Sequence, residues 1–370
     1  MMPMPAWSAL PWPVRAWSKR SCLVAAVVGA VGCAAPPPAP TPAPPAESPQ
    51  PPSPPAIGGW PGAAGDVAGR SDRLLVYLPR RGDTLEGIAA RLLGSADLAW
   101  RIADANGQRW KPVEGQPVIV PLVVENPVGI TADGIQTIPI LCYHRFGLSA
   151  NKMTVTPAQF EAQLQWLARN HYRVLRLGEL TGFLAGREPL PQRSVVITMD
   201  DGYESVHRHA MPLLRKYGFP ATLFVYTDFV GAGDAMSLSQ LRELARSGLV
   251  DIQAHSKTHR NLIQRTPAET EAEHRQAIDG ELRLSRATLE RWLAPAGVQV
   301  RHFAYPYGDA DDLVLESMLR NGFELGVTVN PGGNAFYADP LLLRRTMIFG
   351  DHDLEAFKAR VQIRRTAARP

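Results

Sequence analysis

Short apolar runs alternate with longer amphipathic stretches from residue 138 to residue 361, and this alternation restricts the fold more than any other feature. The apolar runs are typical of strands buried on both faces, and the stretches between them have helical spacing. The predicted strands are 138–143, 195–199, 221–226, 251–254, 302–305 and 325–329. The predicted helices are 157–170, 207–217, 239–247, 267–294 and 311–321. The alternation predicts an α/β fold with a parallel sheet, open or closed, and with functional residues at the carboxyl ends of its strands.

Acidic residues and a histidine follow two of these strands. Asp200 and Asp201 come directly after 195–199, and His144 comes directly after 138–143. Taken alone, Asp-Asp-Gly is a turn signal, and a histidine at a strand end is most often a structural residue. The carboxyl ends of parallel strands meet at one edge of a sheet, so the combination predicts a site there.

Two histidines stand four residues apart after the strand 251–254. One helical turn brings His255 and His259 to the same face, where both can reach one metal ion. The spacing matches the HExxH motif of metalloproteases, but Ser256 stands where those enzymes need glutamate. A metallopeptidase or a peptidoglycan amidase is therefore disfavoured, and a pair of surface histidines is the structural alternative.

Together the sequences TMDDG, HSKTH, FAYPYG and PILCYH resemble the polysaccharide deacetylases of carbohydrate esterase family four, the NodB-homology enzymes. The resemblance covers residues 138 to about 350 and implies a deformed (β/α) barrel. It also implies that Asp200 is the catalytic base and that Asp201, His255 and His259 bind a divalent metal ion. Zinc is the first expectation, and cobalt, nickel or iron would suit the same ligands.

The motif order is similar to the permuted, poly-N-acetylglucosamine deacetylase branch of that family, which has its general-acid histidine at the start of the domain. The resemblance implies His144 as the acid and the backbone N–H of Tyr307 as a donor to the oxyanion. Ala304 stands where many relatives have an arginine that orients the base, and Arg345 is the candidate substitute. The alternative acids are His302, His352 or a metal-bound water.

A smaller module precedes this domain. The sequences GDTLEGIAARLLG, IADANG and GQPVIVP resemble a LysM domain over residues 75–122, which implies a small βααβ unit that binds N-acetylglucosamine-containing glycans. By this resemblance the glycan lies between the loop 82–85 and the loop 106–110. The candidate contacts are Gly82, Asp83, Thr84 and Asn106, and the same residues could instead form helix caps and turns.

The first 35 residues resemble an export signal, because basic residues precede the uncharged run 21–31, which is too short to span a bilayer. Ala-Val-Gly-Cys at its end is similar to a bacterial lipobox, which implies that Cys33 is lipidated; ordinary cleavage near residue 34 or 35 is the alternative. Twelve prolines between residues 36 and 55 predict an extended spacer. The predicted segments are a signal at 1–35, a Pro/Gly-rich linker at 36–72, a LysM domain at 73–123 and a deacetylase domain at 137–361.

Charge and cysteine content exclude some classes of partner. The 39 Lys and Arg residues against 35 Asp and Glu residues leave a net charge of +4, and no basic stripe indicates nucleic-acid binding. Three cysteines cannot form a disulfide framework, so Cys142 is expected to be a lone buried thiol. The expected partners are the glycan and, through the lipid anchor only, a membrane; no protein partner is predicted.

The sequence therefore predicts an exported, metal-dependent deacetylase of the periplasm or cell envelope that removes N-acetyl groups from N-acetylglucosamine-containing polysaccharide. The alternative is a catalytically inactive glycan-binding lipoprotein. Because every predicted acid, base and ligand position is occupied, the enzyme is favoured. Both peptidoglycan and poly-N-acetylglucosamine remain open as the substrate.

Overall fold

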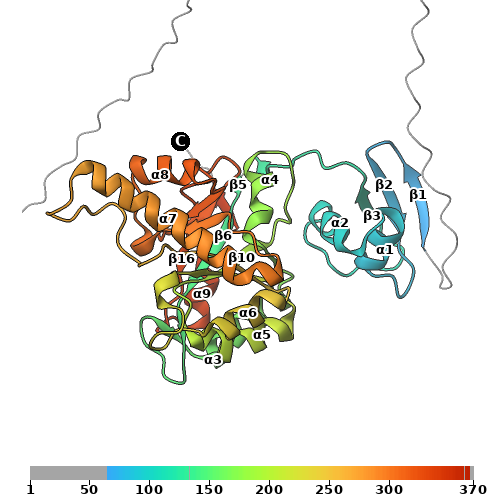
Figure 1. Cartoon of the computed structure of the whole chain (residues 1–370). Coiled ribbons are helices and arrows are strands. Elements are labelled where there is room, and N and C mark those ends of the chain that lie inside the picture. The colour runs from blue at the N-terminus through green and yellow to red at the C-terminus, as the bar shows by residue number, and fades with distance from the viewer. Residues whose placement is uncertain (1–64, 133, 362, 367–370) are drawn as a thin grey trace, which may run out of the picture. The chain divides into compact units, whose positions relative to one another are not determined.

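The computed structural model describes residues 65–132, 134–361 and 363–366 (Figure 1). The predicted signal, Cys33 and the proline-rich part of the linker lie outside the described residues. Within the described ranges, no helix is both long and apolar enough to cross a membrane.

The small N-terminal domain is an antiparallel sheet of three strands packed against two helices. The strands lie in the order β1 (Asp66–Arg70), β2 (Leu74–Leu78), β3 (Val118–Pro121), and the helices are α1 (Leu85–Leu92) and α2 (Ala99–Ala105). Its core contains Leu75, Tyr77, Leu85, Ile88, Ile102 and Val120. The domain has its own apolar core, as an independent module requires.

The strand β1 corrects the sequence prediction, which ended the linker at residue 72 and expected only two strands. β1 pairs with β2 along the edge of the sheet, and four of its five residues are exposed. An exposed edge strand has no alternation of apolar and polar residues, so periodicity does not reveal it. The domain therefore begins near residue 66 rather than at residue 73.

The larger domain is built on a curled, mostly parallel sheet. Its main path is β14-β13-β12-β11-β10-β6-β15, and β9 and β16 pair with β10 and β6. The parallel strands are β6 (Ile138–Tyr143), β9 (Arg173–Leu175), β10 (Ser194–Met199), β11 (Ala221–Val225), β12 (Val250–Ala254), β13 (His302–Ala304), β14 (Leu325–Val327) and β16 (Thr346–Met347). The six predicted strands are all present to within two residues, which confirms the α/β prediction.

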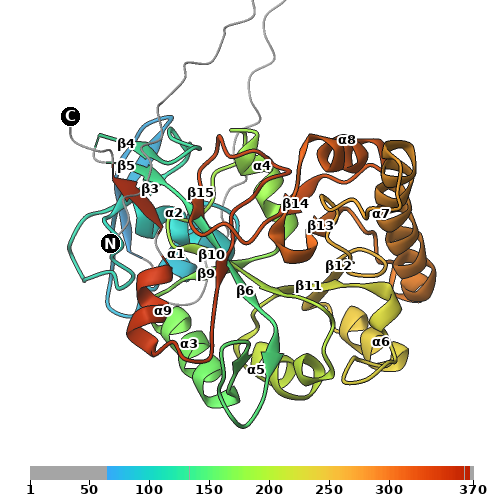
Figure 2. The same ribbon diagram turned by 90° about the vertical axis from the view of Figure 1, so that its left-hand side faces the viewer.

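Helices lie around the outside of this sheet (Figure 2). They are α3 (Pro157–Arg169), α4 (Leu180–Leu184), α5 (Met211–Tyr217), α6 (Leu238–Arg246), α7 (Glu271–Leu293), α8 (Asp312–Arg320) and α9 (Leu354–Arg360). The predicted helix 207–217 is divided, because a π-helical turn at Val206–Ala210 precedes α5. The predicted helix 267–294 begins later, at Glu271, where Thr270 and Glu273 form a capping box.

Short strands with no signal in the sequence complete the domain. A small sheet joins β4 (Ile130–Thr131), β5 (Gly134–Gln136) and β17 (Arg364–Thr366), and β7 (Arg145–Phe146) pairs with β8 (Thr154–Val155). β15 (Gly333–Asn334) pairs antiparallel with β6. Strands of two or three residues are too short for a periodicity to emerge.

One late segment joins the two ends of the curled sheet. Leu343 forms a parallel bridge with Val327 of β14, and β16, directly after it, pairs in parallel with β6. β6 and β14, which lie at the two ends of the row of parallel strands, are thus linked through residues 343–347. Arg345 lies in the middle of this seam.

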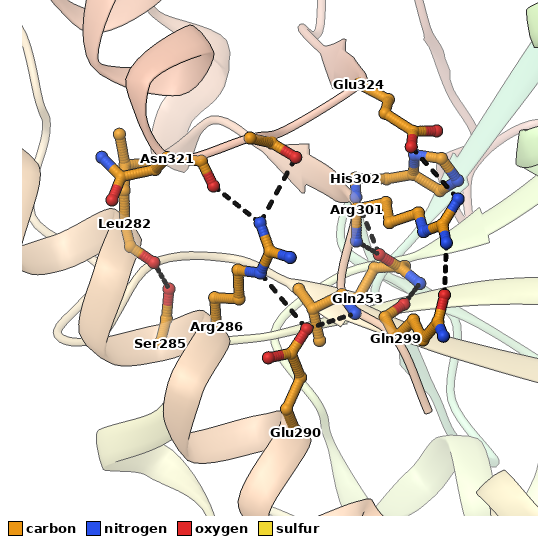
Figure 3. A network of polar contacts seen from close by, with 12 residues as sticks. Gln253, Leu282, Ser285, Arg286, Glu290, Gln299, Arg301, His302, Asn321 and Glu324 are labelled. Atoms are coloured by element: carbon orange, nitrogen blue, oxygen red, sulfur yellow. Dashed lines mark hydrogen bonds and ion pairs between the residues drawn. The ribbon is translucent and has the colours of Figure 1, made fainter. Parts of the chain in front are cut away.

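The long helix α7 is fixed to its neighbours by partly buried polar contacts (Figure 3). Arg286 donates to the carbonyl of Asn321, beyond the end of α8, at 2.6 Å, and Glu290 accepts from the backbone N–H of Val300 at 3.1 Å. Gln253 of β12 accepts from the backbone N–H of both Arg301 and His302 at 2.8 Å. These bonds hold α7, β12 and the start of β13 in one rigid arrangement.

Candidate active site

The predicted site residues gather at the carboxyl ends of the parallel strands. Asp200 and Asp201 follow β10, His144 follows β6, His255 follows β12, and Tyr307 lies three residues beyond β13. β10 is parallel to β6 and β11, and β11 is parallel to β12, so these ends face the same side of the sheet. The parallel arrangement of the strands thus brings together residues from His144 to Tyr307, which are more than 160 positions apart in the sequence.

Asp201, His255 and His259 form a cluster that can hold a metal ion. The Oδ1 atom of Asp201 lies 3.5 Å from Nε2 of His255 and 3.3 Å from Nε2 of His259. Ligands bound tetrahedrally at about 2.0–2.2 Å from an ion lie roughly 3.3–3.6 Å apart, so the spacing fits one ion. Three protein ligands leave a coordination position open, as catalytic metal sites do.

A backbone contact sets the tautomer of His255. Its Nδ1 lies 2.7 Å from the carbonyl oxygen of Ala304, and a carbonyl can only accept a hydrogen bond. Nδ1 therefore carries the proton, and the lone pair of Nε2 points into the cluster. Hydrogen bonds of this kind orient most metal-binding histidines.

The loop between the two histidines has an unusual backbone. Ser256 and His259 both have left-handed conformations, with φ values of 69° and 66°. The hydroxyl of Ser256 accepts the backbone N–H of His259 at 2.8 Å. Non-glycine residues in this region are strained, and such strain collects at functional sites.

A fully buried ion pair holds Asp200. Arg345 donates to both carboxylate oxygens at 2.7 Å, and neither side chain is more than 2% exposed. The guanidinium is itself held by the carbonyl of Thr328 at 2.8 Å and the hydroxyl of Thr198 at 3.2 Å. Arg345 thus lies where it would orient the predicted base, and Ala304 instead provides only its carbonyl to His255.

These contacts keep both aspartates ionised. Burial would raise the pKa of Asp200, but the charge of Arg345 outweighs it and holds the pKa below its ordinary value. Burial of Asp201 is likewise outweighed, by the neighbouring imidazoles of His255 and His259, and its pKa lies well below its usual range. One carboxylate can therefore accept a proton while the other binds a cation.

His144 faces Asp200 from the neighbouring strand end. A nitrogen of its ring, the sulfur of Cys142 and an oxygen of Asp200 all lie within 4.8 Å of one another. Burial lowers the pKa of His144 below that of an exposed histidine. Cys142 is a free, buried thiol, as predicted from the cysteine content.

The two alternative acids lie elsewhere in the domain. His302 is at the start of β13, opposite the strand end that leads to Tyr307, and its pKa is lowered to about 4 by burial. His352 is engaged by the backbone N–H of Phe349 and by Arg360. Neither imidazole belongs to the cluster around Asp200.

Several aromatic rings near the cluster were not predicted from the sequence, which named Tyr307 only for its backbone N–H. The rings of Tyr226 and Tyr307 each lie 5.0 Å from the ring of His259, and Tyr307 is 61% exposed. Tyr226 stacks on Phe229, and Tyr203 meets the edge of Phe229. Only their positions after strand ends could have indicated them, since isolated tyrosines carry no motif.

The predicted glycan contacts of the small domain all have local structural roles. Gly82 has a φ of +92°, and Thr84 caps α1 by accepting the backbone N–H of Gly87. The carboxylate of Asp83 accepts the hydroxyl of Tyr77 at 2.8 Å. The alternative that these residues form caps and turns is thus realised, and contact with a glycan stays a prediction.

Asn106 likewise joins two elements of the small domain. Its side-chain amide donates to the carbonyl of Ile119 at 2.7 Å and accepts the N–H of the same residue at 3.0 Å. Both polar atoms of the Asn106 side chain are therefore hydrogen-bonded to β3.

Comparison with known proteins assigns the larger domain. Residues 187–326 match the family model for polysaccharide deacetylase. The chain carries a polysaccharide deacetylase domain. The protein is therefore an enzyme of the kind that hydrolyses N-acetyl amide bonds, and the matched range contains the Asp-Asp-Gly and His-Ser-Lys-Thr-His sequences.

Relatives match a longer part of the chain than that range. The putative polysaccharide deacetylase YxkH of Bacillus subtilis is 28% identical over 225 residues, which is 61% of this chain and 76% of that protein. The poly-beta-1,6-N-acetyl-D-glucosamine N-deacetylase of Staphylococcus aureus is 28% identical over 200 residues, 51% of this chain and 68% of that protein. The structure of Streptococcus pyogenes deacetylase PplD in complex with acetate has a TM-score of 0.55 at 27% identity and covers 61% of this chain and 98% of that one.

The ion pair between Asp200 and Arg345 makes a prediction for stability. Arg345→Met should lower the free energy of unfolding by about 3–5 kcal/mol at pH 7, because it leaves a buried carboxylate without a counter-charge. In the wild type the lowered pKa of Asp200 contributes stability that is lost as the pH falls through and below its ordinary range. In the variant Arg345 no longer outweighs burial, which should raise that pKa, so stability should instead increase on acidification from pH 7 to about pH 5.

Urea unfolding in the presence of a chelator, at several pH values, measures both effects without a contribution from bound metal. Arg344→Met is the matched control, since Arg344 is exposed and does not contact Asp200. Equal losses in the two variants, or the same pH dependence as the wild type, would show that the pair does not stabilise the fold.

Proposed function

We propose that this protein is an exported, metal-dependent deacetylase that removes acetyl groups from N-acetylglucosamine residues of a polysaccharide. The observation that carries the proposal is the triad of Asp201, His255 and His259 next to a separately held carboxylate, Asp200. The name of the Staphylococcus aureus relative favours a β-1,6-linked poly-N-acetylglucosamine as the first substrate to test. Peptidoglycan is the second, because it suits the LysM-like module.

The residues divide the work of amide hydrolysis. Asp201, His255 and His259 would hold a divalent metal ion, which would supply Lewis-acid polarisation of the acetyl carbonyl and make water more acidic. Asp200 accepts the proton of the attacking water, and Arg345 keeps this carboxylate ionised and oriented. The backbone N–H of Tyr307 donates to the oxygen that becomes negative as the carbonyl carbon turns tetrahedral.

Collapse of the tetrahedral carbon breaks the C–N bond and needs a proton on nitrogen. His144 is the donor, because it lies on the Asp200 side of the site and is not among the metal-binding triad. Its lowered pKa makes the protonated ring a stronger acid toward the leaving amine. The products are acetate and a free amino sugar, so the atoms of one water are consumed.

The aromatic residues beside His259 suit a sugar polymer. Tyr226 and Tyr307 flank the ligand histidine, and the faces of their rings can pack on the C–H groups of a pyranose. Their hydroxyls give polar ends for the sugar oxygens. This surface supports a carbohydrate substrate over a peptide.

Substitution of the two aspartates should have different effects on metal content and on turnover. Asp200→Asn should keep its metal and lose about 10²–10⁴-fold in turnover, because it removes the proton acceptor and leaves the proposed metal ligands in place. Asp201→Asn should lose metal first, since a ligand is weakened. Elemental analysis, and acetate release from soluble poly-β-1,6-N-acetylglucosamine oligomers, distinguish the two.

Asp66→Asn, an exposed substitution in the small domain, is the control for handling of the protein. Metal loss in Asp200→Asn with metal retained in Asp201→Asn would exchange the two roles. Full activity of metal-stripped wild type would refute the mechanism.

His144 should be needed more for a poor leaving group than for a good one. His144→Ala should slow amide hydrolysis by about 10²–10⁴-fold without loss of metal. On an activated aryl acetate the deficit should be much smaller, because the leaving phenolate needs little protonation. His207→Ala, at a surface histidine that pairs with Glu243, is the control. An equal deficit on both substrates would assign His144 to orientation of the site instead.

Export and anchoring are the remaining parts of the proposal. Lipidation of Cys33 would hold the protein at a membrane, and the LysM-like module would hold the enzyme on the glycan. On this basis the wild type should fractionate with membranes, and Cys33→Ala should appear in the soluble envelope fraction. Cys22→Ala controls for a cysteine within the signal, and co-sedimentation with insoluble peptidoglycan tests the module. Membrane association that survives Cys33→Ala would exclude this anchor.

A further inference from the structure

Glu281 is a buried carboxylate that points from α7 at the loop between the two candidate histidine ligands. Its residue is 7% exposed, and charged side chains are almost never buried to this extent without compensation. Among the described residues no ion pair to Glu281 is found, so its compensation comes from hydrogen bonds. Oε2 accepts the backbone N–H groups of Lys257 and Thr258, and Oε1 accepts the hydroxyl of Thr258, all at 2.8 Å.

Those bonds lie at the centre of the strained loop. Lys257 and Thr258 stand between Ser256 and His259, the two residues with left-handed backbones. A loop with two such residues holds its shape only if its surroundings impose it. Hydrogen bonds to an ionised acceptor are about twice as strong as neutral ones, and Glu281 supplies three of them.

The helix that carries Glu281 is itself fixed. Arg286 and Glu290, one to three turns further along α7, are bonded to the end of α8 and to the start of β13 (Figure 3). Glu281 therefore transmits the position of a rigid helix to the loop. The loop is also held from other elements, because the N–H groups of Thr227 and Asp228 donate to the carbonyls of Ser256 and Lys257 at 3.3 and 2.9 Å.

We propose that Glu281 is a positioning residue of the metal site, which holds the loop 255–259 in its ligand-binding shape before any metal arrives. The inference rests on the proposed function only in taking His255 and His259 as ligands. Glu281 contacts neither histidine, and acts by preventing the loop from relaxing into an unstrained conformation that would separate the two rings. A preorganised site binds more tightly because binding need not order it.

The first experiment titrates metal-stripped protein with Co²⁺ and follows its visible absorption. Glu281→Ala should weaken Co²⁺ binding by about 10–100-fold, the range seen when support for a metal ligand is removed. Thr258→Val should have a smaller effect, since one of three bonds is lost. Glu281→Gln should have an effect between those of the wild type and Glu281→Ala, because its amide oxygen can still accept both backbone N–H groups but without the charge.

Glu290→Gln is the matched control on the same helix. It alters a half-buried glutamate that supports Val300 and not the ligand loop, so it should lower thermal stability without changing Co²⁺ affinity. If Glu281→Ala does not fold, the Co²⁺ affinities of Glu281→Gln and Thr258→Val can still be compared with that of the wild type. A Glu281→Ala protein that folds and binds Co²⁺ as tightly as the wild type would overturn the proposal.

The second experiment needs no metal. In the metal-free protein, hydrogen exchange at the amides of Lys257 and Thr258 should be faster in Glu281→Ala than in the wild type, while amides in the sheet are unchanged. Unchanged exchange at both amides would contradict the positioning role. Wild-type protein that binds no Co²⁺ but shows the exchange effect would instead refute the proposed metal site and leave Glu281 as a support of the loop alone.

Discussion

The buried pair of Asp200 and Arg345 is the interaction on which the rest of the deacetylase domain depends. Asp200 ends the central strand β10, and Arg345 lies in the segment that joins the first and last parallel strands of the curled sheet. The guanidinium can be buried because Thr328, Thr198 and the carboxylate satisfy it. The segment that joins the two ends of the sheet therefore also orients the proposed base. A substitution that weakens this segment should affect both the sheet and Asp200.

Around this pair the backbone is strained where the site needs unusual directions. Asp201, Ser256, His259 and Tyr307 all have positive φ values, between 63° and 74°. Each of these conformations costs free energy that a glycine would not, so the domain gives up stability to aim these side chains. The bonds of Glu281 to the loop 255–259 offset part of that cost from outside the strained residues.

Local sequence predicted the parts of the fold that have a period or a motif. The apolar runs predicted their strands, because burial is encoded over a few residues. Asp-Asp-Gly and the histidine pair follow strand ends, as expected. The edge strand β1, the short β9 and β16, and the split of 207–217 left no comparable signal. Arg345 was named only from the missing arginine at Ala304. Glu281 was not named, because its partners are backbone N–H groups that any residue would offer.

The segment 343–347, which joins the two ends of the sheet, also determines when the proposed active site can assemble. Asp200 and Arg345 are 145 positions apart, and β6 near the start of the domain pairs with β16 near its end. Contacts of such long sequence separation form late, because a large loop must close before they are made. During synthesis, the segments that carry the proposed metal ligands are therefore complete well before Asp200 acquires its counter-charge. The proposed site is assembled only when the last part of the domain has been made.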